Sequence, residues 1–351
     1  MSVKLNTQSK ISRISKMLMN QIVRYLLMVV LVLVLFGLIL LIAGKDPIQS
    51  YLDIFRSAFG SAYGFSEVLV GMTPILFTAL AVALPSRLGL INVGGEGQLY
   101  MGACLATWGA LTFSDQPGWI LIPLMVLLGF CGGAMWAVLP GVLKSLGLVN
   151  ETITTLLLNS IAPKLVAFFV FGFWHSPMDT NKTPNFVPAA RLPTFFDTRV
   201  DISLLIGLVL LGIFWFVMTK TRWGLEIRAI GGNPQAAKRN GIPLNKYWIL
   251  VLCIGGGIAG LAGMSQVSGY YGVLLVNFSR GLGFMGFLIS WMSFGDPIAI
   301  TITSFVVSII FTGGNMLQLT RGIPYAVINI LLALTLFVVL AQPSLLKRKT
   351  A

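Results

Sequence analysis

The residues of this chain best suited to chemistry are polar side chains set inside apolar stretches. Segment 92–98 combines Asn92, Glu96 and Gln98 with three glycines in an otherwise apolar run. A bare carboxylate or an unsatisfied backbone group is costly in hydrocarbon, so such a segment persists only inside protein or along a wet cavity. We therefore expect these three side chains to line a translocation path. Alternatively, Glu96 caps the start of the following helix and never touches solute.

A second polar stretch begins at Asn150. Glu151 suits the positive end of a helix, and Thr155 and Asn159 lie on or near one face of it. Such side chains either bond to neighbouring helices or contact a solute. We count Asn159 among the candidates for the path, together with Gln266 further along the chain.

Lys164 stands in the middle of an apolar run, directly after Pro163. Three explanations fit its position. Its long stem reaches the membrane surface, it pairs with Glu151 or Glu96, or the helix here has other limits than we predict.

No sequence feature supports an enzyme. The chain has no GxxxxGK[ST] loop, so any ATP-driven step needs a separate ATPase. A single histidine cannot supply a Ser–His–Asp set, and no HExxH helix occurs. Cys104, Cys131 and Cys253 lie in apolar stretches without paired spacing, which suggests neither a disulfide framework nor a zinc site. We expect no cofactor in this chain.

The composition is that of a membrane protein. Of 351 residues, 56% are hydrophobic and 10% are charged, whereas a soluble domain has about 25% charged residues. The net charge of +13 comes from basic residues beside apolar runs, so it reports membrane topology rather than nucleic-acid binding. The sequence predicts an all-α polytopic fold.

About ten apolar stretches are long enough, or nearly so, to cross a bilayer. An alternative count of eight treats the pair within 282–313 as re-entrant. The ten predicted spans are 25–43, 67–86, 92–113, 119–143, 152–174, 202–219, 246–267, 282–294, 298–313 and 324–340.

The basic residues orient these spans. Residues 1–24 contain five Lys or Arg and no acid, so we place them in the cytoplasm. An even number of spans returns the basic tail 342–351 to the same side. One transmembrane domain, 25–341, then carries a cytoplasmic loop at 220–246 and an outer loop at 174–201. The outer loop is rich in proline, which indicates a structured loop rather than a folded domain.

The cytoplasmic loop contains a short helix with its own start and stop signals. Asn233 is a suitable N-cap, Pro234 fits the first helical position, and Gly241 fits the C′ position. Lys238 and Arg239 suit the last turn. A helix this short is unstable alone, so it either docks on a partner or is only a solvated loop helix.

Four segments resemble one family of transporters. Gln235, Ala236 and Ala237 followed by Gly241 resemble the EAA-type coupling motif of ABC-importer permeases, with Gln in place of the usual Glu. Segment 89–98, GLINVGGEGQ, resembles the signature GLxNIGxEGQ of permeases for simple sugars and nucleosides. Segment 150–159 resembles the same family's NExITTxxLN, and the small residues of 255–263 resemble its SGxxAGLAG.

The resemblance implies a type II ABC-importer permease with discontinuous helices. It implies cytoplasmic ATPase subunits that bind ATP and Mg, a second permease subunit that is identical or related, and an extracytoplasmic binding protein that docks at 174–201. It also implies a bacterial inner membrane with both chain termini in the cytoplasm. The residues that would couple to the ATPase are Asn233, Pro234, Gln235, Ala236, Ala237, Lys238, Arg239 and Gly241.

Within the family the sequence is most similar to nucleoside permeases. Simple sugars such as ribose or galactose are the second choice, and branched-chain amino acids the third. Two other classes stay open: a secondary transporter coupled to protons through Glu96, Glu151 or Asp296, and a static scaffold or channel.

Overall fold

The computed structural model describes residues 30–176, 179, 181–195, 198–324, 326–327, 329–331 and 333–334. Over these residues the chain is helical, and its extended pairings are isolated bridges in the outer loop and its neighbour. The predicted all-α class is confirmed. The basic ends 1–24 and 342–351, and most of the last predicted span, 324–340, lie outside the described residues.

Six helices of the described chain are long and apolar enough to cross a membrane. The count becomes seven if Val30–Ile42 and α2 (Pro47–Phe59), which are bent by 115°, form one broken span. The six are α3 (Ala62–Ser86), α5 (Gly118–Ser145), α6 (Glu151–Phe171), α7 (Ile202–Lys220), α10 with its extension (Leu244–Tyr271) and α12 (Pro297–Arg321). The multi-pass architecture is therefore present, and the figure of ten crossings stays a prediction.

Two further predicted spans correspond to α4 (Gly95–Thr112) and to the short helix α11 (Leu282–Met292). Helix α2 was not among the elements predicted from the sequence. This helix alternates exposed apolar residues such as Ile48 and Phe55 with Asp53 and Arg56, so it is too polar to register as an apolar span.

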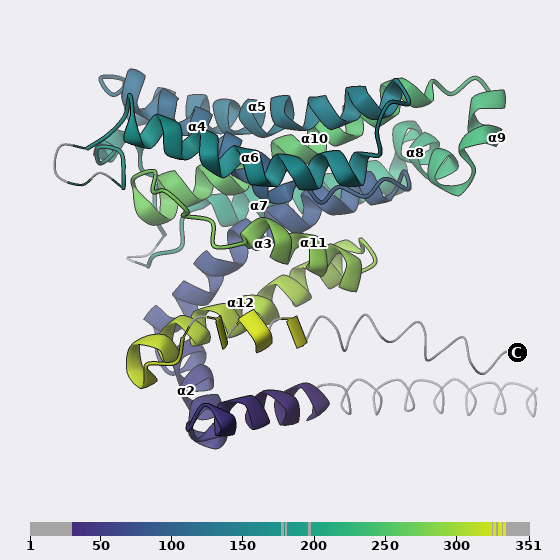
Figure 1. The fold of residues 1–351 in the computed structure, drawn as a ribbon. Helices are drawn as coiled ribbons and strands as arrows, with labels where there is room; N and C mark the ends of the chain where they lie inside the picture. The colour runs from purple at the N-terminus through teal and green to yellow at the C-terminus, as the bar shows by residue number, and fades with distance from the viewer. Residues whose placement is uncertain are drawn as a thin grey trace, which may run out of the picture. The chain divides into compact units, whose positions relative to one another are not determined.

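The chain forms two compact units, and the larger comprises Ser57–Thr312. In this unit α10 packs against α3, α4 and α5 (Figure 1). Glycines make the contact close, because a Cβ at Gly260 would lie 2.1 Å from the carbonyl oxygen of Gly129. A Cβ at Gly263 would lie 2.0 Å from the carbonyl oxygen of Leu99. The small residues of 255–263 thus serve close helix packing, as their spacing predicts.

The end of α10 changes helical type and then gives way to irregular backbone. Residues Gln266–Tyr271 form a π-helix, which ends at Gly272 with φ of 67°. Segment 272–281 leads to α11 and contains Asn277 and Arg280, both with positive φ. Such backbone in a membrane protein requires protein contacts to satisfy its polar groups.

The helix α11 packs against α3 (Figure 1). A Cβ at Gly286 would lie 2.1 Å from Thr78 Oγ1, so the two helices approach closely. The Thr78 hydroxyl also lies 3.2 Å from the carbonyl oxygen of Leu282, at the start of α11.

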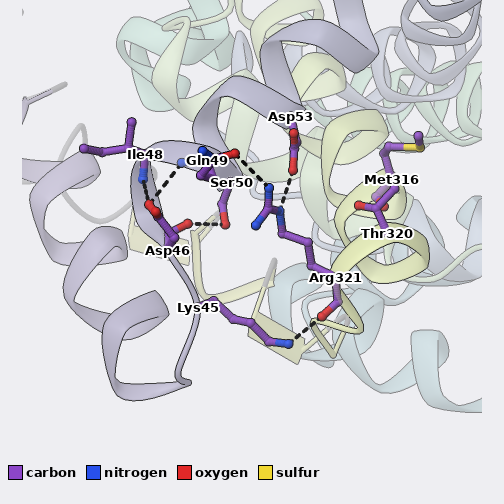
Figure 2. A network of polar contacts seen from close by, with 9 residues as sticks. All are labelled: Lys45, Asp46, Ile48, Gln49, Ser50, Asp53, Met316, Thr320 and Arg321. Carbon is purple, nitrogen blue, oxygen red and sulfur yellow. Dashed lines mark hydrogen bonds and ion pairs between the residues drawn. The ribbon is translucent and has the colours of Figure 1, made fainter.

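The smaller unit comprises Met1–Arg56 and Gly313–Ala351, and its described residues include a polar network (Figure 2). Asp46 caps α2 by accepting from the backbone N–H groups of Ile48 and Gln49. Arg321 forms an ion pair with Asp53, and its carbonyl oxygen accepts from Lys45 Nζ at 2.6 Å. These contacts tie the start of α2 to the end of α12.

Candidate functional site

The polar segment before α4 folds back on its own side chains. Asn92 and Gln98 form a reciprocal amide pair, with Asn92 Nδ2 donating to Gln98 Oε1 at 3.1 Å and Gln98 Nε2 donating to Asn92 Oδ1 at 3.0 Å. Asn92 Oδ1 also accepts from the Gly94 N–H at 3.0 Å. Both side chains are buried. Their hydrogen-bonding groups therefore stabilise the break in the chain that lets α4 begin at Gly95.

The first turns of α6 hold the same segment from the other side. Asn159 Oδ1 accepts from the Gly97 N–H at 2.8 Å, and Asn159 Nδ2 donates to the Val93 carbonyl at 2.8 Å. Thr155 Oγ1 accepts from the Val93 N–H at 3.2 Å. The two polar stretches that the sequence singles out thus meet, and side chains of α6 satisfy backbone groups of the segment before α4.

Glu96 joins the starts of two helices. Its Oε2 accepts from the Gly283 N–H at 2.7 Å, within the first turn of α11, while the residue itself lies in the first turn of α4. A carboxylate is favourable at the positive end of a helix dipole, and here it serves two such ends. The capping alternative for Glu96 therefore has direct structural support.

Glu151 lies at the start of α6 and is also buried. Its Oε2 lies 2.7 Å from Lys144 Nζ, at the end of α5, and its Oε1 accepts from the Ile91 N–H at 3.5 Å. The Lys144 ammonium lies 5.8 Å from the centre of the Trp248 ring on α10. This cluster connects α5, α6 and α10 to the segment before α4. The sequence did not identify Lys144 as part of it.

Two candidate residues lie apart from this cluster. Gln266 is buried at the start of the π-helix. Within the described part of the chain, its side chain forms no hydrogen bond with the other four path candidates. Lys164 is exposed on α6, and it pairs with neither predicted partner, since Glu151 binds Lys144 and Glu96 binds the Gly283 N–H.

The short helix predicted within loop 220–246 is present as α9 (Pro234–Arg239). The Asn233 side chain caps it by accepting from the Ala236 N–H at 3.0 Å, Pro234 occupies the first position, and Gly241 has φ of 81°. Ala237 is buried, while the other predicted coupling residues are exposed. The helix is thus anchored by one small side chain and presents the rest of its surface.

A second helix, α8 (Arg222–Gly232), precedes α9 and was not predicted. Its Glu226 accepts a hydrogen bond from the Tyr247 hydroxyl of α10 and pairs with Arg222 at 3.1 Å. The hydrogen bond from Tyr247 is the main reason that the pKa of Glu226 is lowered. The i,i+4 spacing of Arg222 and Glu226 on a helix was the available sequence signal.

The end of α8 also meets the end of α3. A Cβ at Gly231 would lie 2.1 Å from the carbonyl oxygen of Arg87, and Arg87 Nη2 donates to the carbonyl oxygen of Gly295 at 2.7 Å. Arg87 therefore links the α8–α9 segment to the turn between α11 and α12. Helices α8 and α9 lie together beyond the ends of α5 and α10 (Figure 1).

The outer loop is bonded to the irregular segment that follows α10. The Thr183 N–H donates to the Leu274 carbonyl at 3.1 Å, and the Phe186 N–H donates to the Gly272 carbonyl at 2.9 Å. Further along the loop, the Ser268 hydroxyl donates to the Ala190 carbonyl. The described residues of this loop are therefore held by hydrogen bonds, in line with the prediction of a structured loop, and they contact the backbone that leads to α11.

Comparison with known proteins identifies relatives along most of the chain. Residues 64–340 match the family model "branched-chain amino acid transport system / permease component". The chain is 33% identical to the glucose ABC transporter permease TsgB13 of Haloferax volcanii, over 86% of this chain and 82% of that one. It is 32% identical to the nucleoside ABC transporter permease NupB of Lactococcus lactis, over 88% and 89%.

A third relative is the guanosine ABC transporter permease NupP of Bacillus subtilis, which is 28% identical over 90% of this chain and 91% of its own length. No solved structure matches the chain. The matches cover the segment before α4, the first turns of α6 and the α8–α9 segment within one family alignment.

Proposed function

Because this chain belongs to the family of branched-chain amino acid transport system permease components, we propose that it is the membrane subunit of an ABC importer whose solute is a nucleoside. The observation that carries this proposal is the similarity to the nucleoside permease NupB over nearly the whole of both chains. NupP, whose solute is guanosine, supports the same solute class. TsgB13 keeps a sugar as the second candidate.

The α9 helix is the proposed contact with the ATPase. Its residues from Pro234 to Arg239 are exposed except Ala237, so they are accessible to a partner. Behind it, Tyr247 and Arg87 connect α8 to α10, α3 and the turn before α12. A movement of α9 can therefore be transmitted, through the contacts of α8 with Tyr247 and Arg87, to the helices that surround α4.

The five predicted path residues take two proposed roles. Three of them shape the path rather than bind solute: Asn92, Gln98 and Asn159. Their side chains already form hydrogen bonds with one another or with nearby backbone. Glu96 fixes the starts of α4 and α11 relative to each other. Gln266, at the π-helix, remains a candidate for contact with solute, since π-helical turns often occur at functional sites.

The full assembly is proposed to contain cytoplasmic ATPase subunits, which bind ATP and Mg, a second permease chain and an extracytoplasmic binding protein on the outer loop. The chain is proposed to cross the membrane about ten times, with both termini in the cytoplasm. The α4 and α11 helices would then be parts of discontinuous crossings, with Glu96 between their starts.

The decisive experiment uses membrane vesicles that contain the assembled transporter. We expect uptake of radiolabelled guanosine or uridine only with ATP, the ATPase and the binding protein. Unlabelled glucose should compete weakly. Strong competition by glucose would instead favour a sugar permease.

The same vesicles distinguish a secondary transporter. Uptake by the permease alone under a pH gradient would contradict the ABC mechanism and would point to proton coupling through Glu96, Glu151 or Asp296.

A further inference from the structure

The helix α6 has one face packed in protein and one face bare within the described chain. Its buried residues recur every three or four positions, and this face packs against α4 and α5. The opposite face carries exposed apolar residues such as Leu157 and Ile161. Among them are Ser160, Lys164 and Phe168, which are also exposed and follow one another at four-residue spacing. We call these three residues the α6 stripe.

Lys164 lies deep within its helix. It is thirteen residues after Glu151 and seven before Phe171, which places it about 20 Å and about 10 Å from the two ends. In the six candidate spans of the described chain, every other charged side chain lies within five residues of a helix end. Its ammonium forms no ion pair and no cation–π contact with the part of the chain that the structure describes.

The direction of the side chain argues against a lipid-facing position. The Cα–Cβ bonds of an α-helix tilt toward its N-terminus, so the stem of Lys164 leads toward the middle of α6 and away from its nearer end. Reaching the closer membrane surface would require the stem to fold back. An ammonium in this place is stable beside water or a polar partner, and costly beside lipid.

The exposed face of α7 has the composition expected of a surface toward lipid. Its exposed positions, including Leu208, Val209 and Ile213, are apolar through the middle of the helix. Its one charged residue, Lys220, is the last residue of the helix, where it reaches the surface. The α6 stripe differs because its polar residues lie at mid-helix.

The third member of the stripe adds an aromatic surface. Phe168 is 60% exposed, and its ring lies 5.7 Å from that of Phe169 and 6.0 Å from that of Phe173, in edge-to-face arrangements. Phe169 in turn stacks on Trp174 at 5.0 Å. The exposed ring of Phe168 therefore belongs to a cluster of aromatic rings and lies one helical turn from Lys164.

We propose that the α6 stripe lines a water-filled solute path and binds the nucleoside during passage. The Lys164 ammonium donates hydrogen bonds to carbonyl oxygens or ring nitrogens of the base, Ser160 bonds to a hydroxyl of the sugar or to the base, and Phe168 stacks on the base. A neutral solute with a planar, acceptor-rich ring satisfies all three groups. The assignment rests on the proposed function and extends it to named contacts.

The first test measures access to water and needs no transport. In a background with Cys104, Cys131 and Cys253 replaced by alanine, Lys164→Cys and Ser160→Cys are compared with Ile213→Cys on the exposed face of α7. A membrane-impermeant, charged maleimide should label the two α6 variants about tenfold faster, because a thiol ionises in water and not in lipid. Guanosine should slow the labelling of the α6 variants. Labelling of Lys164→Cys as slow as that of Ile213→Cys would overturn the proposal.

The second test measures transport by the complete complex. Lys164→Met should lower kcat/KM for guanosine uptake by about tenfold or more, since a hydrogen bond from a charged group is lost. Lys164→Arg, which keeps the donor and the charge, should restore most of it. Equal uptake by wild type and Lys164→Met would contradict the proposed contact. If the wild-type complex takes up no nucleoside at all, the proposed solute fails, while the labelling test still reports whether the stripe faces water.

Discussion

At the scale of single residues, the polar groups of the segment before α4 and of the neighbouring part of α6 form hydrogen bonds with one another. Asn159 shows this most directly, because its amide serves one backbone N–H and one backbone carbonyl across two helices. Similar logic applies to Glu96 at the start of α11. Side chains that a sequence suggests for solute binding can thus be needed to hold the backbone in place.

Replacing Asn159 by leucine should destabilise the protein. The change leaves the Gly97 N–H and the Val93 carbonyl buried and unpaired, at a cost of about 1–3 kcal/mol each. The melting temperature of the purified protein in detergent measures this loss. Ile153→Ala, at an exposed position of the same helix, is the control and should change the melting temperature little. An unchanged melting temperature for Asn159→Leu would show that these bonds are not needed.

The hydrogen bond between Tyr247 and Glu226 predicts a pH dependence. The pKa of Glu226 is lowered chiefly by this bond, so its contribution to stability is present above the ordinary value of 4.5 and is lost as the pH falls through the lowered value. Tyr247→Phe should therefore reduce the melting temperature at pH 7, and the difference from wild type should shrink as the pH falls below 4.5 and through the lowered pKa of Glu226. A difference that does not vary with pH would contradict this role for the carboxylate.

At the scale of elements, the helices of the larger unit are held by close packing, and the irregular backbone after α10 is held by hydrogen bonds. The helix α10 approaches α4 and α5 through glycines, which fixes the centre of the larger unit. The π-helix and the segment 272–281 that follow it are held by the outer loop instead. The α8–α9 segment forms a third element, which packs against the end of α3 and is hydrogen-bonded to the start of α10.

Gly260→Leu should prevent the packing of α10 on α5. A Cβ at this position already lies 2.1 Å from a backbone oxygen, which cannot move aside as a side chain would. We expect a loss of at least about 3 kcal/mol and little folded protein in the membrane. Gly212→Leu on α7 is the matched control, since a Cβ there meets nothing within 4 Å. Normal abundance of Gly260→Leu, judged by size-exclusion chromatography in detergent, would contradict the packing.

Arg239→Glu tests the coupling surface of α9. Arg239 is exposed in the last turn, so charge reversal should leave the fold intact while it weakens docking of the ATPase. We expect normal membrane abundance, reduced co-purification of the ATPase and uptake lowered by about tenfold or more. Lys220→Glu, also exposed but on the end of α7, is the control. If uptake and co-purification remain normal, α9 is not the docking surface.

At the scale of the whole molecule, the central question is which surfaces face which compartment. The proposed mechanism needs the α9 helix and the outer loop on opposite sides of the membrane. Both contain exposed residues that can be labelled, Gln235 in α9 and Asn185 in the loop. The positions of these residues give a direct test of topology.

In intact cells, Asn185→Cys should react with an impermeant maleimide, whereas Gln235→Cys should react only after the membrane is permeabilised. The experiment uses the background without native cysteines. Buried Ala237→Cys is the negative control and should react slowly in both cases. Labelling of Gln235→Cys from outside would reverse the orientation and remove the basis for coupling to a cytoplasmic ATPase.

The sequence by itself determined the class of protein, the family, and the local features that depend on neighbouring residues. The capped helix between Asn233 and Gly241 is an example, because its start and stop signals act within a few residues. The glycine spacing on α10 likewise indicated close packing before any partner helix was known.

Only the tertiary structure decided which polar residues find partners. The bond from Arg87 to Gly295 and the bonding of loop 174–201 to segment 272–276 join residues far apart along the chain, and the pairing of Lys144 with Glu151 joins the end of α5 to the start of α6. No local pattern encodes these contacts, since they follow from how the helices pack. The same packing leaves the Lys164 side chain exposed on α6, whereas the Asn159 side chain on the same helix is hydrogen-bonded to backbone. Lys164 is therefore available to a solute and Asn159 is not.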